Sequence, residues 1–382
     1  MKEISLERLL ADGFRMKNAK ALLASFEKDT TCGLFDDEFI DRAHKNGFSA
    51  YDAMTYGITE EHMHEYLSTY IWHKLCPVND WERIWINDKL TLKYMLDGTE
   101  FSDCMPKYYY YADRTKGLIS LIDNPHKKDS PVTISDFVDL LHEVETFACK
   151  PNNGSYSRNF FKIKAVSDGI KINDENISSE DLKKFVDEHP NFIYTEFLKP
   201  SALFSKFGST AAKVRMMMLN PKSTKPKMIG AYLELPHSES GSTTHTEDLR
   251  GKQYNLVCDV NFETGEFDKG QMLFLDKVVP CSNHPETNEP LTGVLPDFKN
   301  LLHIVFGIAE RFNLIELMGY DFLHTGDGWK ITEINSHPGV VNVQSYRPLF
   351  KNPDVLNFVR DKLAKIDNLT DLERKARNNL SC

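Results

Sequence analysis

Three oxygen-bearing side chains in the last quarter of the chain are spaced so that they could hold a metal ion. Glu333 and Asn335 are two residues apart on an expected strand, so both face the same side of it. If residues 326–328 form a three-residue loop with Gly328 in the left-handed conformation, Asp321 lies directly opposite Glu333. Two carboxylates and one amide oxygen are suitable ligands for Mg²⁺. A two-residue loop would instead turn Asp321 and Glu333 to opposite faces, and a solvated hairpin with ordinary surface acids is the alternative interpretation.

Three basic residues could supply the opposite charge. Lys150 ends an apolar strand and enters a polar loop, where its ammonium group and the N–H groups of the loop suit a phosphate chain. Lys89 opens an expected helix. Each lysine taken alone is equally well explained as a surface residue. Arg215 stands mid-strand among methionines, so its guanidinium needs an anionic partner, either a structural acid or a phosphoryl group.

A mixture of helices and strands must position these residues. Residues 1–80 show apolar residues at helical spacing, which predicts a helical region packed on the main body. The remainder mixes strands and helices without βαβ regularity, which favours an α+β fold. The expected strands cover 107–111, 118–122, 147–150, 160–166, 192–197, 213–219, 228–235, 256–262, 271–275 and a hairpin over 316–335, and the expected helices cover 88–96, 135–146, a segment capped by Ser178 with Asp181, a segment capped by Asp297, and the tail 354–380.

The composition limits the class of protein. The chain has 382 residues, enough for two to three domains, with 41% hydrophobic and 27% charged residues, as is ordinary for a globular protein. A net charge of −10 argues against a general nucleic-acid groove but is compatible with a local basic pocket. Seven cysteines without a CxxC pattern predict reduced thiols and a cytoplasmic protein. We expect no signal peptide, and no apolar window reaches the ~20 residues that a membrane span requires.

Taken together, these segments resemble the ATP-grasp superfamily, and in detail its branch called sugar-transfer-associated ATP-grasp. The resemblance covers roughly residues 81–345. Its motifs stand in the family's order: Trp85-Ile86-Asn87-Asp88-Lys89, Cys149-Lys150-Pro151 with Gly154-Ser155, Tyr194-Thr195-Glu196-Phe197-Leu198, Val214-Arg215, Gly319-Tyr320-Asp321, and Glu333-Ile334-Asn335 with Pro338-Gly339.

The resemblance implies an ATP-grasp fold, in which two α+β subdomains hold ATP between them. The small and central subdomains, with the phosphate loop and the adenine hinge, would occupy 81–198. The C-terminal subdomain, with the Mg²⁺ site and the acceptor pocket, would occupy 199–350. The helical region 1–80 and the C-terminal helices 351–382 gain nothing from the resemblance.

The resemblance also implies a role for each matching residue, with ATP and Mg²⁺ as cofactors. Lys89, Lys150, Gly154, Ser155 and Arg158 would bind the phosphates; Glu196, Phe197 and Leu198 would hold adenine and ribose; Asp321, Glu333 and Asn335 would bind Mg²⁺; and Arg215, Lys150 and His337 would act on the reacting groups.

Two segments depart from the family pattern. The strand 228–235 carries Glu234 where an arginine is common, and the following loop holds His245 among serines and threonines. We expect both to line the acceptor pocket, where an acid and hydroxyl groups would suit an amine or a hydroxylated sugar, although a surface loop explains the composition equally well. His337 stands where a basic residue is common, so a phosphate contact there would depend on pH.

The reaction that the resemblance implies is ATP-dependent ligation of a carboxylate and an amine. The carboxylate would be activated as an acyl phosphate, on a saccharide-linked or peptide-linked acid in polysaccharide or natural-product decoration. An ATP-grasp kinase that phosphorylates a hydroxyl is the first alternative, with Glu234, His245 or Asp259 as base. A nucleotide-binding pseudoenzyme is the second.

Overall fold

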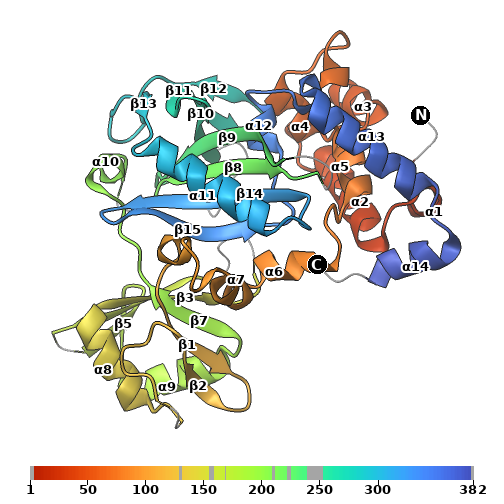
Figure 1. The fold of residues 1–382 in the computed structure, drawn as a ribbon. Helices are drawn as coiled ribbons and strands as arrows, with labels where there is room; N and C mark the ends of the chain where they lie inside the picture. Colours follow the sequence, from red (N-terminus) through yellow and green to blue (C-terminus); the bar gives the residue numbers. More distant parts are fainter. Residues whose placement is uncertain are drawn as a thin grey trace.

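Two antiparallel sheets and a separate group of helices make up the chain (Figure 1). The computed structural model describes residues 4–128, 131–154, 159–167, 169–208, 211–221, 225–238 and 253–379. Helices and strands are mixed without parallel pairing among the described residues, so the expected α+β class is confirmed. None of the described helices combines the length and apolar character needed to cross a membrane.

The first helices form the region at one side of the molecule, shown in red to orange in Figure 1. Ser5, Asp36, Ser49 and Ser68 each accept a backbone N–H with the side chain at a helix start, which explains where four of these helices begin. The expected helical character of residues 1–80 is confirmed. The helices are α1 (Leu6–Ala11), α2 (Met16–Thr31), α3 (Asp37–Lys45), α4 (Ala50–Tyr56) and α5 (Thr69–Leu75).

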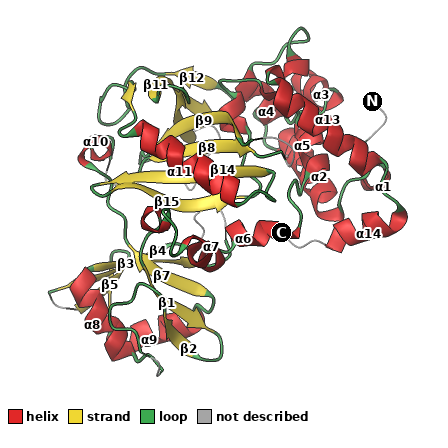
Figure 2. Cartoon of the chain, in the orientation of Figure 1, coloured by secondary structure: helices red, strands yellow, loops and turns green. Residues whose placement is uncertain are grey.

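The smaller sheet contains seven strands, and the helices α8 (Ile134–Val144) and α9 (Ser179–Glu188) cover one face of it (Figure 2). Tyr110, Phe137, Phe147 and other aromatic residues fill the core on that face. In spatial order the strands are β2 (Gly117–Ser120), β1 (Tyr108–Asp113), β7 (Phe192–Glu196), β3 (Thr146–Pro151), β4 (Phe161–Val166), β5 (Gly169–Ile172) and β6 (Glu175–Ile177). The sequence did not predict the hairpin of β5 and β6.

The larger sheet has eight strands, among them the hairpin that carries the predicted metal ligands. Its spatial order is β12 (Val278–Pro280), β11 (Glu266–Phe274), β10 (Tyr254–Val260), β9 (Lys227–Leu235), β8 (Lys213–Leu219), β14 (Leu317–Thr325) and β15 (Gly328–Asn335), with β13 (Gly293–Val294) paired to β11.

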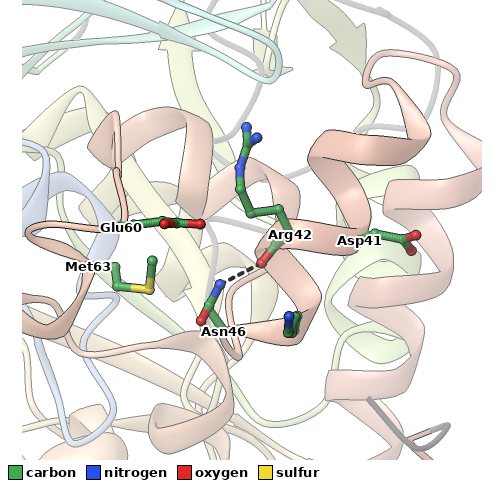
Figure 3. A pocket seen from close by; sticks show the side chains of 6 residues that line it. Asp41, Arg42, Asn46, Glu60 and Met63 are labelled. Atoms are coloured by element: carbon green, nitrogen blue, oxygen red, sulfur yellow. Dashed lines mark hydrogen bonds between the residues drawn. The ribbon is translucent and has the colours of Figure 1, made fainter.

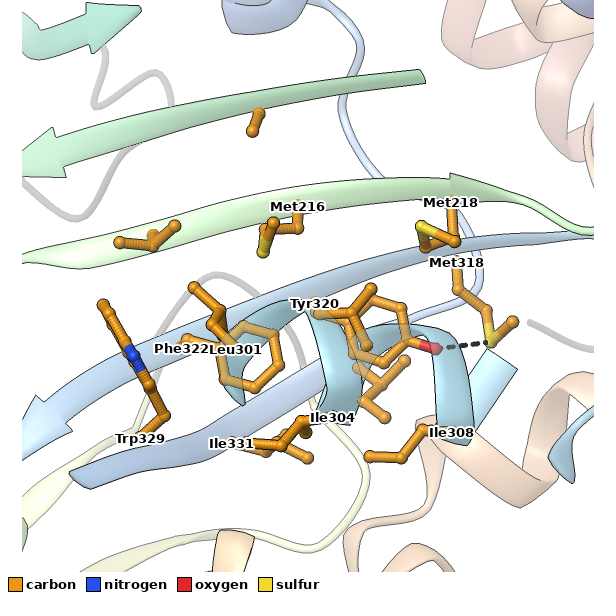
Figure 4. Close-up of a cluster of buried hydrophobic side chains, with 14 of the residues drawn as sticks. Met216, Met218, Leu301, Ile304, Ile308, Met318, Tyr320, Phe322, Trp329 and Ile331 are labelled. Carbon is orange, nitrogen blue, oxygen red and sulfur yellow. Dashed lines mark hydrogen bonds between the residues drawn. The ribbon is translucent and has the colours of Figure 1, made fainter. Parts of the chain in front are cut away.

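The larger sheet buries both faces, and β8 shows how. Met216 and Met218 pack beneath the helix α11 (Phe298–Arg311), together with Tyr320 and Phe322 of β14 (Figure 4). The alternate residues Met217 and Leu219 pack on the opposite side, against the helices α12 (Val341–Gln344) and α13 (Pro353–Asp367). A strand that is buried on both faces consists mostly of consecutive apolar residues. Arg215 is therefore an exception within β8.

Short elements link these parts. Ile86, Leu92 and Leu96, from α6 (Ile84–Asn87) and α7 (Lys89–Leu96), pack into the core of the larger sheet. The remaining helix is α10 (Ala202–Ser205), and short 3₁₀ turns cover Met63–Glu65, Trp81–Arg83, Ser102–Cys104 and Leu349–Lys351.

The helical region is joined to the sheet by buried side-chain amides. Gln344 accepts the Leu67 N–H at 2.8 Å, and its Nε2 donates to the Leu67 carbonyl and to the Tyr56 hydroxyl, each at 3.0 Å. Asn79 accepts the Glu316 N–H at 2.7 Å. Both amides are almost fully buried, so these hydrogen bonds fix how the helices meet the sheet.

Two sequence expectations differ from the structure at helix ends. The tail forms two helices, α13 and α14 (Asp371–Asn379), because the chain turns at Asn368. Asp297 stands before α11 as expected, but with φ 45° it is left-handed and its side chain makes no capping hydrogen bond. The six cysteines of the described residues are free thiols, as expected of reduced cysteines.

Candidate active site

The hairpin β14–β15 places Asp321 directly opposite Glu333, as expected, but by a different route. The turn is tighter than predicted, because Thr325 pairs with Gly328 rather than with Trp329. A two-residue connection alone would turn the two acids to opposite faces. The ladder shifts by one residue between Asp321 and Phe322, where β15 holds one residue more than β14, and this bulge restores the pairing.

The bulge also provides hydrogen-bonding groups. The extra residue in β15 is Thr332, whose hydroxyl donates to the Asp321 carbonyl at 3.1 Å. The Thr332 carbonyl accepts from Lys150 Nζ at 3.4 Å. Lys150 belongs to the smaller sheet, so this contact joins the two sheets at the predicted metal end.

Asp321 lies within a polar row that crosses five strands. From β10 to β15, Asp259, Tyr232, Arg215, Asp321 and Glu333 pair directly with one another in turn. Residues directly opposite in antiparallel strands share one face, so the row lies on the face of the larger sheet away from α11.

Arg215 finds its anionic partner within this row. The guanidinium and the Asp321 carboxylate form a two-pronged ion pair, in which Nη2 donates to Oδ2 at 2.8 Å and Nε donates to Oδ1. Burial disfavours the charged guanidinium, but the attraction of Asp321 outweighs this cost and raises the pKa of Arg215. Of the two partners that the sequence left open, the described structure contains the structural acid.

Lys89 and Lys150 converge on Glu333 from different elements. Burial, and after it the charge of Lys89, lowers the pKa of Lys150 to about 8 against the opposing effect of Glu333. Burial also lowers the pKa of Lys89, against the opposing effects of Glu333 and Asp88. For Glu333, burial and Asp321 raise the pKa, and both lysines oppose that rise. Both ammonium groups therefore act on Glu333, and neither has a carboxylate oxygen within 4.0 Å in the described part of the chain.

The start of the predicted phosphate loop is held against α7. Asn152 accepts the Leu90 N–H at 2.8 Å, and its amide donates to Asp88 at 2.7 Å. Lys89 Nζ donates to the Gly154 carbonyl at 3.1 Å, so Gly154 lies beside the first lysine. Ser155 and Arg158 lie outside the described residues. No individual role was predicted for Asn152 or Asp88, although an acid in the capping position before Lys89 is a signal that the sequence contains.

The predicted adenine hinge follows β7. Glu196 accepts the Lys107 N–H at 3.1 Å, and its own N–H donates to the Lys107 carbonyl at 2.8 Å. The ammonium of Lys162 lies 4.8 Å from the centre of the Phe197 ring. Leu198 is half-buried. These residues remain candidates for holding a nucleotide base.

The predicted acceptor residue Glu234 forms an ion pair with Lys213 at 3.1 Å. Burial opposes the charge of Lys213, but Glu234 and Asp321 together raise its pKa. The sequence analysis missed Lys213, although it stands two residues before Arg215 and therefore shares its face. Tyr232, buried between Arg215 and Asp259 in the row, could not be found without the register. His245 lies outside the described residues.

His337 does not join the lysines. Its Nδ1 lies 2.7 Å from the Ser336 hydroxyl, and its Nε2 is buried without a hydrogen-bond partner in the described structure. Burial, and after it the charges of Arg83, Arg15 and Lys17, lowers its pKa to about 4. The charges that act on the ring are therefore those of basic residues in the helical region and in the segment before α6.

The donor set suits Mg²⁺ in chemistry. Asp321 and Glu333 face each other, and Asn335 is on the same face of β15, which gives hard oxygen ligands of the kind Mg²⁺ takes. Within the described ranges, no three His, Cys, Asp or Glu side chains form a metal-binding group by themselves. Asn335 or phosphate oxygens would therefore have to complete the set, and both Asp321 oxygens are engaged with Arg215.

A hollow of about 390 Å³ lies elsewhere, on the helical region (Figure 3). Asp41, Arg42 and Lys45 of α3 line it together with Glu60 and Met63. Its lining thus contains both acids and bases, and the Asn46 amide donates to the Arg42 carbonyl at 2.9 Å. It contains none of the predicted site residues.

Comparison with known proteins finds likeness among solved structures only. No protein-family model matches the chain, and no curated protein matches its sequence. An N5-carboxyaminoimidazole ribonucleotide synthetase solved with ADP matches 66% of this chain and 45% of its own, with 10% identity and a TM-score of 0.34. A D-alanyl-alanine synthetase A from Vibrio cholerae matches 74% and 66%, with 12% identity and a TM-score of 0.39. The N5-carboxyaminoimidazole ribonucleotide synthetase from Thermotoga maritima matches 66% and 42%, with 11% identity and a TM-score of 0.31.

The matched region thus spans less than half of two of these chains and about two thirds of the third. All three proteins are named as synthetases. At these identities and TM-scores, the likeness alone assigns this chain neither a family nor a reaction.

Proposed function

We propose that the chain is an ATP-dependent ligase that joins a carboxylate to an amine through an acyl phosphate and releases ADP. The observation that carries the proposal is the approach of two lysines, the buried Lys89 and the partly buried Lys150, to the carboxylate of Glu333. Ammonium groups withdrawn from water with no carboxylate oxygen within 4.0 Å in the described part of the chain call for an anion from outside it. Two facing acids next to this charge suit a metal that accompanies a polyphosphate.

Each residue then has a physical task. When bound, Mg-ATP supplies the phosphoryl group and a metal that shields its charge. Lys89 and Lys150 bind and orient the phosphates, and Asp321, Glu333 and Asn335 hold the metal. Arg215 stabilises negative charge on the carboxyl group as it is activated. Such positioning and charge stabilisation account for most of the catalysis in phosphoryl transfer.

The substrates belong to the same proposal. A carboxylate attacks the γ-phosphorus, ADP leaves, and an amine then displaces phosphate from the acyl group to form an amide. Lys213 and Glu234 line the acceptor side of the row. We further propose that the acid is saccharide-linked or peptide-linked and that the enzyme acts in the cytoplasm, which rests on the family resemblance and the free thiols.

The kinase alternative has less support in the described structure. It needs a free base to take a proton from a hydroxyl group, and of the three predicted bases only Glu234 and Asp259 lie within the described residues. Asp259 is bound by Arg347 through both oxygens, and Glu234 is bound by Lys213. Carboxylates held in ion pairs are poor bases.

ADP release from Mg-ATP tests the function. The protein is incubated with uronic acids, amino acids and amines, singly and in acid–amine pairs. We expect ADP only when both an acid and an amine are present, and none from a Lys150→Met variant. ADP release with a single hydroxylated compound would indicate the kinase, and no nucleotide binding at all would contradict the proposal.

A further inference from the structure

Another hollow, of about 550 Å³, lies between the helix α7 and the smaller sheet. Asp88 and Tyr94 line it from the side of the helix. Tyr111 of β1 and Asn152, which directly follows β3, line it from the side of the sheet. None of these four side chains has a part in the proposed ligase chemistry, so the hollow is a separate candidate site.

Two different faces of α7 serve the predicted phosphate site and this hollow. The buried residues of the helix are Lys89, Leu92, Lys93 and Leu96. The helix residues that line the hollow are Leu90, Thr91, Tyr94 and Met95. Residues three and four apart share one face of a helix, so the two sets form separate faces. The Lys89 ammonium donates to the Gly154 carbonyl at 3.1 Å and does not line the hollow.

The register of the smaller sheet places the hollow near the lysines but away from the predicted adenine hinge. Tyr111 pairs with Ile193 near the start of β7, whereas the hinge follows the end of that strand. Lys150 pairs with Ile193 from the other side. Tyr111 and Lys150 are therefore on the same face and two strands apart, a distance of ~10 Å.

The Asp88 carboxylate accepts hydrogen bonds only from neutral donors. Its Oδ1 accepts the Thr91 N–H and its Oδ2 accepts the Asn152 amide, each at 2.7 Å. Each oxygen keeps a further lone pair. In the described part of the chain, no lysine, arginine or histidine nitrogen lies within 4.0 Å of these oxygens. The negative charge at this end of the hollow therefore has no direct counter-ion.

The rest of the lining adds no positive charge. No lysine, arginine or histidine side chain is among the residues that line the hollow. Arg311 donates to the Met95 carbonyl at 3.1 Å. Met95 stands seven residues after Asp88, which is ~10 Å along the helix axis. Arg311 therefore acts at the other end of α7, and the end with Asp88 stays negative.

Aromatic rings lie on both sides of the hollow. Tyr94 is 50% exposed, so a ligand can reach its ring. Tyr111 is half-buried, and its hydroxyl donates to the Asn191 side chain at 2.9 Å, which holds the ring in place. Burial, and after it the charges of Asp123 and Asp97, raises the pKa of Tyr94. Carboxylates thus also determine the electric field at this tyrosine.

We propose that the hollow binds an organic ammonium group, with Asp88 as its counter-ion and the rings of Tyr94 and Tyr111 beside it. A cation gains from the carboxylate by Coulombic attraction and from an aromatic ring by the cation–π interaction. Leu90 and Met95 are half-buried in the lining and suit the apolar part of such a compound. This site goes beyond the proposed ligase function and does not depend on it.

The test measures the binding of choline to the full chain by isothermal titration calorimetry at constant ionic strength. We expect saturable binding that Tyr94→Leu weakens ~5-fold or more, through loss of the cation–π interaction. Asp88→Asn should weaken it by a similar factor, and asparagine can still cap α7. Tyr94→Phe keeps the ring and should keep the affinity within ~2-fold.

Two controls make the test specific. Phe160→Leu removes another exposed aromatic ring, one outside the hollow, and should leave choline binding unchanged. The uncharged analogue of choline, with a tert-butyl group in place of the trimethylammonium, should bind at least ~5-fold more weakly.

The proposal would be overturned by the absence of saturable choline binding, by equal affinity in Tyr94→Leu, or by equally tight binding of the uncharged analogue. Tyr94 is exposed, so its substitution does not endanger folding if Asp88→Asn fails to fold. Choline has no nitrogen lone pair and cannot replace the amine of the ligase reaction, so the outcome is independent of the proposed function.

Discussion

Two groups of buried charge lie side by side in the site, and they differ in how they are balanced. Arg215 and Asp321 satisfy each other through two contacts on adjacent strands. Lys89 and Lys150 share Glu333 and otherwise donate to backbone carbonyls. The charges of the first group are balanced within the folded chain. The second group needs a further anion to balance its lysines, and it is called the incomplete group below.

This difference separates what folding explains from what function must explain. A closed ion pair is needed to bury Arg215 inside a sheet, so its presence alone says little about a ligand. Two lysines that approach one acid weaken the folded state, because burial and mutual repulsion both oppose their charge. Such a cost is typical of a binding site.

The largest expected effect comes from opening the closed pair. Asp321→Ala leaves the Arg215 guanidinium buried without its acid, and we expect a loss of ~3–5 kcal/mol in the free energy of unfolding. Urea denaturation followed by circular dichroism measures it.

The matched control is Asp354→Ala, which removes the exposed partner of Lys227 in an ion pair of 2.6 Å. We expect a change of ~0–1 kcal/mol there. Equal losses in the two variants would show that the Arg215–Asp321 pair is not buried as described.

Asp52, a buried acid outside the site, is a third case, because a hydroxyl group and not an opposite charge is its partner. Asp52 is held by the Thr69 hydroxyl, and burial raises its pKa from 3.8 to about 6. Between these pH values the folded chain keeps a proton that the unfolded chain has released. Stability from this group is therefore fully present below pH ~4 and falls by roughly 3 kcal/mol as the pH rises through 6.

Asp52→Asn should remove this dependence. Unfolding free energies at pH 4.5 and 7.5, measured on both proteins, give the two slopes. If the unfolding free energy of the wild-type chain changed between pH 4.5 and 7.5 by the same amount as that of the variant, the raised pKa of Asp52 would be contradicted.

The smallest effect on stability is expected at the incomplete group. Lys150→Met removes a partly buried charge that Lys89 repels, so the free energy of unfolding should stay the same or rise. Affinity for Mg-ATP should fall ~10- to 100-fold, as for the loss of one charged hydrogen bond to a phosphate. Calorimetric titration together with urea denaturation separates the two readouts. A variant that loses stability but keeps affinity would place Lys150 with Arg215, as a structural residue.

The sequence predicted individual residues better than their partners. An arginine among methionines in β8 required an acid, but only the register of β8 with β14 identified it as Asp321. The prediction that Asp321 lies opposite Glu333 was correct, but it assumed a three-residue turn. The structure has a two-residue turn and a bulge at Thr332, and no local sequence pattern marks that bulge. Lys213 could have been predicted from the sequence, because it lies two residues before Arg215 and therefore on the same face of the strand. Contacts that depend on how separate segments meet, such as Asn79 with Ser336, had no local signal.

The bulge at Thr332 also determines which length changes the hairpin can tolerate. The bulge that restores the pairing of Asp321 with Glu333 lies four residues inside β15. This pairing therefore does not depend on the local conformation of the turn at the end of the hairpin. Residues added in pairs near Asp327 would lengthen the arm without rotating either acid. Deletion of Thr332 would remove the bulge yet keep Asp321 opposite Glu333, because Glu333 would then follow Ile331, the partner of Phe322. A bulge that straightened with Thr332 still present would instead pair Asp321 with Thr332 and turn Glu333 toward α11, which would disable the site without replacing any of its side chains.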